Sequence, residues 1–314
     1  MILLRFPARA GQRLVAVFGT GLIGSSVVAA LERKGAIREK EFPISWHDPI
    51  ERAEHFLAIE AEIVRLLGEG YDEGLQLVWS AGRCGFEASQ AEADLEWDGF
   101  EAWLHSLERI ARRTPGREIR FCLISTAGGL FEGQRHVDRS SQPNPSRPYG
   151  RLKLDQEERI QAGGAPWTPA IMRLTAVVGP VGRGHRQGLV STLVANGLRR
   201  WPTRIVGRME TLRDFISVDD VAGFIARRIH RRLDPADPPV MTLASFKPSS
   251  LAEIQKRVER VLGRRLDVHY ALSPSNEMDI TFSPALRPAD WMPRDLFATI
   301  RDLYQDALTR GVVV

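Results

Sequence analysis

Tyr149 and Lys153 lie four residues apart in the stretch Ser-Arg-Pro-Tyr-Gly-Arg-Leu-Lys-Leu-Asp-Gln-Glu, residues 146–157. Because residues four apart share one face of a helix, the phenol and the ammonium would be neighbours if this stretch is helical. A free phenol has a pKa of about 10, and a nearby ammonium lowers that pKa by stabilising the phenolate. Such a pair can take a proton from an alcohol. The same spacing also occurs by chance in surface helices, so other parts of the sequence must show whether this pair has a catalytic role.

Two hydroxyl residues, Ser125 and Thr126, follow a strongly apolar run that begins at Ile119, and glycines come after them. The apolar run predicts a buried strand. Ligands of an open parallel sheet bind beyond the carboxyl ends of its strands. We therefore expect the two hydroxyls to lie beside a ligand, close to the helix that carries Tyr149 and Lys153, where a hydroxyl would orient a substrate oxygen.

The first apolar run leads into Gly19-Thr-Gly21-Leu-Ile-Gly24, and a helical pattern follows directly. This order of strand, glycines and helix is typical of a dinucleotide-binding loop. Gly19 permits a tight turn, Gly21 lets the backbone approach a pyrophosphate, and Gly24 lets the helix pack on the strand. The helix N-terminus would face the phosphates. The cofactor-binding residues expected here are Gly19, Gly21, Leu22, Ile23 and Gly24.

Asp48 follows the second expected strand, Phe42–His47, where the adenosine ribose of a dinucleotide would be bound. A carboxylate there would accept hydrogen bonds from both ribose hydroxyls and repel a 2′-phosphate, so it favours NAD over NADP. Two alternatives stay open. Asp48 directly precedes a proline and an expected helix, so it is also a candidate N-cap, and Arg52 would favour NADP. A later strand ends in Ala81 and Gly82, whose small size would let the cofactor pass close to the backbone.

Strand-like apolar runs alternate with amphipathic helical stretches in the first half of the chain, which predicts an α/β, Rossmann-like, doubly wound parallel sheet covered by helices on both faces. The expected strands are Leu14–Phe18, Phe42–His47, Leu75–Ser80, Ile119–Ser125 and Ala170–Val178. The expected helices are Leu22–Gly35, Glu51–Leu67, Trp97–Arg113, Tyr149–Gln161, Asp219–Arg232, Ser249–Leu262 and Pro293–Arg310.

After about residue 180 this regularity loosens, and segments such as Gly182–Gly188 and Asp234–Pro239 are rich in Gly, Pro or charge. We expect a dinucleotide-binding domain over residues 1–180 and a smaller, interleaved substrate-binding lobe over residues 181–314.

The composition is that of a globular protein, with 43% hydrophobic and 26% charged residues among 314. No apolar run approaches the ~20 residues of a membrane span. The two cysteines, Cys84 and Cys122, provide neither a disulfide framework nor a metal cluster. Basic and acidic residues are interleaved, so no nucleic-acid-binding stripe is evident. These features predict a cytoplasmic protein without a metal, a nucleic-acid partner or a membrane partner.

Taken together and in order, four stretches resemble the extended short-chain dehydrogenase/reductase family, which contains nucleotide-sugar epimerases and dehydratases. They are the glycine loop at 19–24, Ser125-Thr126 after a buried strand, Tyr149-Gly-x-x-Lys153 with Glu157 one turn later, and Leu212-Arg-Asp-Phe-Ile-Ser-Val-Asp-Asp220. The stretches at 171–180 and at Trp291-Met-Pro293 also resemble parts of the family pattern.

The resemblance implies that Tyr149 is the base and that Lys153 assists it and holds the nicotinamide ribose. It implies that Thr126 is the active-site hydroxyl, with Ser125 as the alternate. Leu174 and Thr175 would lie beside the nicotinamide. Arg213 would contact the diphosphate of a nucleotide sugar, unless it instead forms an ion pair with Asp214 or Asp219. The implied cofactor is NAD, with NADP as the alternative, and the implied assembly is a homodimer.

The chain also departs from the family pattern. Phe18 stands where the first loop glycine is usual, and Ala176 replaces an asparagine that contacts the sugar nucleotide. No Asp-Glu pair follows Thr126, which argues against a 4,6-dehydratase. The main hypothesis is an NAD-dependent epimerase or reductase of a nucleotide sugar. The alternatives are an alcohol or ketone oxidoreductase acting on a non-nucleotide substrate and a non-catalytic NAD(P)-sensing protein.

Overall fold

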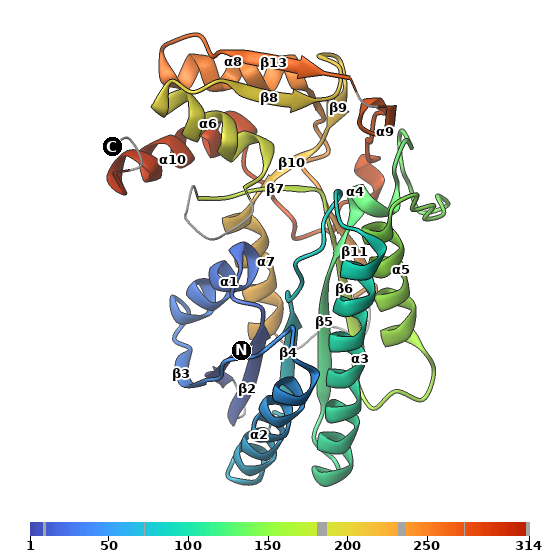
Figure 1. The fold of residues 1–314 in the computed structure, drawn as a ribbon. Helices are drawn as coiled ribbons and strands as arrows, with labels where there is room; N and C mark the ends of the chain where they lie inside the picture. Colours follow the sequence, from blue (N-terminus) through green and yellow to red (C-terminus); the bar gives the residue numbers. More distant parts are fainter. Residues whose placement is uncertain (9–10, 72, 181–186, 232–236, 273, 312–314) are drawn as a thin grey trace. The chain divides into compact units, whose positions relative to one another are not determined.

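The computed structural model describes residues 1–8, 11–71, 73–180, 187–231, 237–272 and 274–311 (Figure 1). Contacts divide the chain into two units that alternate along the sequence. Unit 1 consists of Met1–Leu130, Pro145–Arg173 and Ala222–Met241, and unit 2 of Phe131–Asn144, Leu174–Val221 and Thr242–Val314. The chain changes unit several times, and the substrate-binding lobe expected after residue 180, interleaved with the first domain, stays a prediction. Most of the expected loop segments at 182–188 and 234–239 lies outside the described residues.

A seven-stranded sheet forms the centre of unit 1, in the order β11-β6-β5-β4-β2-β1-β3. The strands are β1 (Ile2–Ala8), β2 (Gly11–Phe18), β3 (Ile37–Glu41), β4 (Leu75–Trp79), β5 (Ile119–Thr126), β6 (Thr168–Leu174) and β11 (Val240–Leu243). Strands β2, β4 and β5 pair in parallel. The Rossmann-like sheet predicted from the alternation of strands and helices is therefore confirmed, and β2, β4 and β5 end at one edge.

The edge of the sheet beyond β2 differs from the prediction. The apolar N-terminal run forms β1, which pairs antiparallel with β2, and β3 pairs antiparallel with β1. The prediction of a strand at Phe42–His47 was wrong. The strand that follows the first helix comes earlier in the chain, at Ile37–Glu41. β1 occupies the position beside β2 because four of its apolar side chains are almost fully buried, namely Ile2, Leu3, Leu4 and Phe6.

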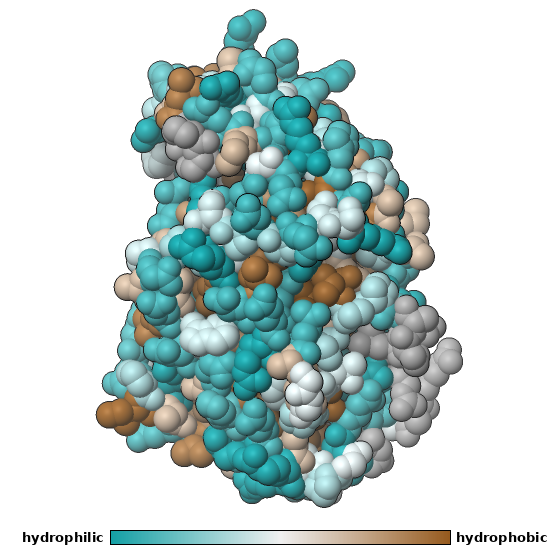
Figure 2. Space-filling model, turned by 90° about the vertical axis from the view of Figure 1, so that its right-hand side faces the viewer, coloured by the Kyte–Doolittle hydropathy of each residue, from teal (hydrophilic) through white to brown (hydrophobic). Residues whose placement is uncertain are grey.

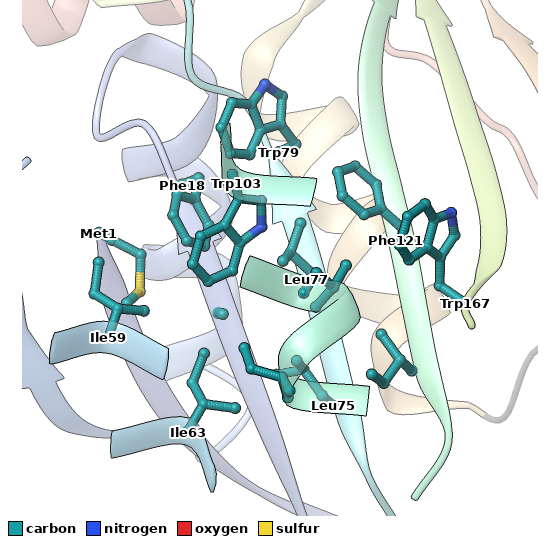
Figure 3. Close-up of a cluster of buried hydrophobic side chains, with 14 of the residues drawn as sticks. Met1, Phe18, Ile59, Ile63, Leu75, Leu77, Trp79, Trp103, Phe121 and Trp167 are labelled. Atoms are coloured by element: carbon teal, nitrogen blue, oxygen red, sulfur yellow. The ribbon is translucent and has the colours of Figure 1, made fainter. Parts of the chain in front are cut away.

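Three helices cover one face of this sheet: α2 (Pro49–Gly68), α3 (Gln90–Arg113) and α5 (Pro148–Gln161). Their apolar stripes join alternate residues of the strands in one buried cluster, in which the rings of Phe18, Trp79 and Trp103 meet (Figure 3). Helices α1 (Leu22–Glu32) and α7 (Val218–His230) contribute no described residue to this cluster and lie on the other face (Figure 1).

Helix α3 begins earlier than its apolar pattern predicted. Ser89 and Glu92 form a capping box, in which each side chain bonds the backbone N–H of the other residue. A capping box satisfies two of the N–H groups that a helix leaves unpaired at its start, so the helix extends N-terminally to Gln90. This extension includes Glu96, whose carboxylate accepts the backbone N–H groups of Arg83 and Cys84 after β4.

Unit 2 has its own core, to which α6 (Leu189–Arg199), α8 (Leu251–Leu262) and α10 (Leu296–Thr309) contribute. Its strand pairs are β7 (Ala176–Val178) with β10 (Phe215–Ser217), β8 (Thr203–Val206) with β13 (Val268–Ala271), and β9 (Leu212–Arg213) with β12 (Ser249–Ser250). Its short helical segments are α9 (Pro274–Glu277) and a 3-10 turn at Pro284–Leu286. The single strand expected at Ala170–Val178 is interrupted at Thr175 and becomes β6 and β7.

The face of the molecule seen in Figure 2 is mostly hydrophilic, with hydrophobic residues in separate patches. Within the described residues, no helix combines the length and the apolar character that a membrane crossing requires.

Candidate active site

The glycine loop between β2 and α1 has the geometry of a phosphate cradle. Gly19 has φ +83°, a conformation that L side chains rarely adopt, and a Cβ there would lie 2.5 Å from the backbone nitrogen of Ala81. A Cβ on Gly24 would lie 1.8 Å from the carbonyl oxygen of Gly19. By contrast, a Cβ on Gly21 would meet nothing within 4 Å. Gly19 and Gly24 are thus required by close packing, while Gly21 leaves space in front of α1.

The start of α1 has no side-chain cap, since Gly21 is its N-cap residue. The first N–H groups of a helix lack intrahelical partners and attract anions. Leu22 and Ile23 provide the first of these N–H groups. The space in front of Gly21 and the uncapped helix therefore fit the pyrophosphate of a dinucleotide.

The carboxyl end of β4 is bonded directly to this loop. The Ser80 hydroxyl lies 2.7 Å from the carbonyl oxygen of Phe18 and 2.9 Å from that of Gly19. Ala81 is buried and Gly82 is exposed with φ +146°. The expected cofactor-binding residues of the two strand ends are thus neighbours at one edge of the sheet.

Asp48 adopts the alternative role considered for it, as the N-cap of α2. Its Oδ1 accepts the backbone N–H of Ile50 at 2.8 Å and that of Glu51 at 3.1 Å. Arg52 is buried, and its Nη1 donates to the carbonyl of Trp46 at 3.1 Å. Because β1 separates β3 from β2, Asp48 does not follow a strand adjacent to β2, as the sequence had suggested.

The two hydroxyls after β5 differ in their surroundings. Ser125 is buried and donates to Oε1 of Glu157, whose carboxylate is also held by Arg173 through Nε and Nη2. Thr126 Oγ1 accepts the N–H of Gly129 at 3.1 Å and keeps its own hydrogen for another acceptor. Ser125 therefore anchors α5 to the sheet, and the role of Thr126 as the active-site hydroxyl stays a prediction.

Two glycines bring Thr126 and Tyr149 together. After β5 the chain forms the short helix α4 (Ala127–Leu130), and a Cβ on Gly129 would lie 2.8 Å from Cγ2 of Thr126 and 3.2 Å from the Tyr149 ring. A Cβ on Gly150 would lie 2.3 Å from the carbonyl oxygen of Gly129. The N-terminus of α5 thus packs directly on α4, and the half-buried Tyr149 ring lies beside Thr126.

Lys153 is buried one turn after Tyr149. Its Nζ lies 3.2 Å from Oε1 of Glu96 and 2.9 Å from Oε1 of Gln156. Burial by itself lowers the pKa of Lys153, but the negative charge of Glu96 and the proximity of Tyr149 raise it above its ordinary value. The ammonium is therefore charged at neutral pH and lies close enough to Tyr149 to act on the phenol electrostatically.

Sequence reasoning did not identify Glu96, Gln156 or the role of Gly129. Glu96 is a carboxylate within a helix that buries most of its apolar side, and Gln156 lies one turn after Lys153. A polar residue one turn from a catalytic candidate is a usable signal for Gln156. Nothing in the local pattern distinguishes Glu96 from the other acidic residues of α3, because its partner comes from another helix.

The remaining residues predicted to bind cofactor or substrate belong to unit 2. Leu174 and Thr175 are buried, and the Thr175 hydroxyl donates to Oδ1 of Asp214 at 2.9 Å. The Arg213 guanidinium donates to backbone carbonyls, at 2.6 Å to Met278 and 3.0 Å to Asn276.

The two carboxylates considered as ion-pair partners of Arg213 each contact other residues. The Asp214 carboxylate accepts hydrogen bonds from Thr175 and from the Ser245 hydroxyl. The Asp219 carboxylate lies 3.5 Å from Nη2 of Arg294. The diphosphate role of Arg213 and its ion-pair alternative both stay predictions.

Comparisons with known proteins bear on the family and the fold of the chain. The model of the NAD dependent epimerase/dehydratase family matches residues 16–244. The search of curated protein sequences found no match.

Solved structures with the same fold include a UDP-glucose 4-epimerase of Thermus thermophilus in complex with NAD, at 19% identity and a TM-score of 0.72, covering 93% of this chain and 99% of that one. A UDP-glucuronic acid 4-epimerase of Bacillus cereus, in complex with UDP-glucuronic acid and NAD, has 18% identity and a TM-score of 0.71, covering 95% and 99%. RMD from Pseudomonas aeruginosa, complexed with NADPH, has 17% identity and a TM-score of 0.69, with the same coverages.

Proposed function

Since the chain belongs to the NAD-dependent epimerase/dehydratase family, an enzyme family of the extended short-chain dehydrogenase/reductase type, we propose that it is an epimerase or reductase of a nucleotide sugar. The observation that carries the proposal is the arrangement of Tyr149, Lys153 and Thr126 at the same sheet edge as the glycine loop. An acid–base group next to a dinucleotide cradle is the arrangement needed for oxidation of an alcohol or reduction of a ketone.

The cofactor proposed is NAD, with NADP as the alternative. Gly19, Gly21 and the first turn of α1 would hold its pyrophosphate, and Ala81 and Gly82 would lie along it. Leu174 and Thr175 would contact the nicotinamide, as the family resemblance implies. When bound, the nicotinamide ring supplies the acceptor or donor of a hydride.

The chain's own residues would handle the proton and orient the substrate. The Tyr149 phenolate would take the proton of a sugar hydroxyl, and the phenol so formed would return that proton to the ketone oxygen in the reverse direction. The Thr126 hydroxyl would hold the same substrate oxygen. The Lys153 ammonium would stabilise the phenolate, because an opposite charge nearby favours the ionised form. Arg213 would contact the diphosphate of the substrate.

Structures that share the fold contain UDP-glucose or UDP-glucuronic acid, which makes UDP-sugars the first candidates. The purified protein should be melted with NAD and each UDP-sugar in turn, because a ligand at 100 times its Kd stabilises the folded state by about 2.7 kcal/mol. Sugars that raise Tm are then incubated with the protein and the products separated by chromatography. We expect at least one to be epimerised or to change redox state.

If no nucleotide sugar raises Tm while a simple alcohol or ketone is turned over, the proposal is overturned in favour of an oxidoreductase for non-nucleotide substrates. Ala176 favours this rival, since the family's asparagine contact is absent. A protein that binds NAD or NADP and converts nothing would be a sensor.

The preference for NAD rests on the Asp48 carboxylate, whose Oδ1 already caps α2. Titration of NAD and NADP against the tryptophan fluorescence of the protein would compare the two affinities. We expect NAD to bind more tightly, because the carboxylate would repel a 2′-phosphate. Tighter binding of NADP than of NAD would contradict this assignment. In that case Asp48→Asn, which keeps the capping oxygen, would leave the ratio of the NAD and NADP affinities unchanged.

A further inference from the structure

The buried carboxylate of Glu96 connects two parts of the candidate site. Its Oε1 lies 3.2 Å from Nζ of Lys153, and its Oε2 accepts the backbone N–H groups of Arg83 and Cys84, both at 3.0 Å. The side chains of Glu96 and Lys153 are only 9% and 8% exposed. One carboxylate thus binds the ammonium on α5 and the loop that follows β4.

The Glu96 carboxylate also lies close to the backbone of Gly82, in the loop that follows β4. A Cβ on Gly82 would lie 2.4 Å from Oε1 of Glu96, so a residue with a side chain at this position would displace the carboxylate. Gly82 therefore has two physical reasons to be a glycine: its φ of +146° and the room that it leaves for Glu96.

The pair also limits what the ammonium can do. A lysine ammonium has three N–H donors, and two of those of Lys153 point to Glu96 and Gln156. Burying a charged pair costs desolvation free energy, and well-packed apolar residues often stabilise a fold as well or better. A buried pair beside a proton-transfer group therefore calls for an explanation other than stability.

We infer that Glu96 is a positioning residue for Lys153: it holds the ammonium at the sheet edge, leaves one N–H donor for a ligand, and offsets the charge that Lys153 exerts on Tyr149. This inference rests on the proposed function, because it takes Tyr149 as the group that moves the proton. With Glu96 ionised, its negative charge offsets part of the positive charge of Lys153, so the ammonium favours the phenolate of Tyr149 less strongly.

The other titratable groups around the pair do not replace Glu96 in this role. Burial raises the pKa of the Cys84 thiol to about 12, so it is neutral at working pH. The Glu157 carboxylate is bound by Arg173 and Ser125. On the side of Tyr149, Arg147 lies over the ring of Phe86, 4.9 Å from its centroid. Helix α4 carries no charged residue.

The test measures ionisation of the Tyr149 phenol in the protein without cofactor or substrate, from the near-ultraviolet absorbance of tyrosinate against pH. Only four tyrosines are present, and subtracting the curve of Tyr149→Phe isolates the signal of interest. We expect Glu96→Gln, which keeps the size of the side chain and removes the charge, to shift the midpoint about one pH unit downward.

The matched control is Glu101→Gln, which removes another carboxylate of α3 that pairs with α5, 2.8 Å from Nε of Arg159, without touching Lys153. It should leave the midpoint where it is in the parent. A midpoint that stays unchanged in Glu96→Gln, or moves equally in both variants, overturns the inference.

If Glu96→Gln does not fold, as judged by circular dichroism, Glu96→Asp takes its place. The shorter side chain keeps the charge but withdraws it from Nζ, so a smaller downward shift is expected, and no shift overturns the inference. Turnover of nucleotide sugars is measured separately. A shifted midpoint without turnover would contradict the proposed function and leave the coupling of Glu96 to Tyr149 established. Turnover with an unshifted midpoint would support the proposed function and overturn the coupling.

Discussion

Turnover should depend on the phenol oxygen of Tyr149 more than on any other single atom of the chain. Tyr149→Phe removes the proton-transfer group and keeps the ring that packs beside Gly129 and Phe86. We expect turnover to be abolished while NAD affinity stays nearly that of the parent, because the cradle is formed by other residues. Steady-state kinetics and a fluorescence titration test the two statements.

The matched control for Tyr149→Phe is Tyr304→Phe, in α10 of unit 2. This variant should turn over at the parental rate. Activity of Tyr149→Phe within a few-fold of the parent would remove the phenol from the mechanism.

Arg213 provides a second test at the scale of one residue. Its guanidinium donates to the carbonyls of Leu212, Asn276 and Met278, so it connects two segments of unit 2. If it also binds a diphosphate, Arg213→Lys should weaken binding of UDP by roughly 1.5–3 kcal/mol, the scale of a charge-assisted hydrogen bond, because lysine lacks the planar fork. Calorimetric titration with UDP measures this loss.

NAD affinity serves as the internal control for Arg213→Lys and should change little. A variant that melts much earlier than the parent yet binds UDP normally would show that Arg213 acts only by holding residues 276–278.

At the scale of elements, the contact between α4 and α5 determines where the phenol lies. Gly129→Ala would place a methyl group 2.8 Å from Cγ2 of Thr126 and 3.2 Å from the Tyr149 ring, so one of the two side chains has to move. Displacing a catalytic group by about 1 Å can cost on the order of 100-fold in rate. We expect kcat/KM to fall by about 10- to 100-fold.

Gly128→Ala is the control for this element, since its added methyl group would meet only the Phe86 ring, at the ordinary contact distance of 3.5 Å. It should keep most of the parental kcat/KM. Equal losses in the two variants would mean that α4 tolerates no side chain at all and that the contact with Tyr149 is not the cause.

At the scale of the whole molecule, Asp214 links stability to pH. Burial raises the pKa of its carboxyl above the ordinary value, and the hydrogen bonds from Ser245 and Thr175 only partly oppose this. The folded protein therefore retains the proton to a higher pH than the unfolded chain, whose aspartates titrate at about 3.9. Asp214 contributes most to stability below that pH, and this contribution is lost as pH rises through the folded-state pKa.

Asp214→Asn cannot ionise and still accepts a hydrogen bond through its amide oxygen. We expect the free energy of unfolding of the variant, relative to the parent, to increase as pH rises from about 4 toward neutrality. Urea unfolding at a series of pH values measures it. Asp302→Asn, at a position with a 51% exposed side chain, is the control. A relative stability of Asp214→Asn that is constant or falls over this range would contradict the prediction.

The sequence by itself determined the alternation of strands and helices, the glycine loop and the pairing of Tyr149 with Lys153. These depend on short-range rules: apolar periodicity, glycine conformation and the spacing of four on a helix. For the same reason α2, α5 and the strands β4 and β5 were predicted within a few residues of their bounds.

Only the tertiary structure decided what lies next to these residues. The apolar N-terminal run forms β1 and pairs with β2, where its side chains are buried. The strand that follows the first helix therefore pairs with β1 and not with β2. Glu96 became the partner of Lys153 through the packing of α3 on α5. Pairings between distant segments form only when those segments pack against one another in the folded chain, so no local pattern of residues encodes them.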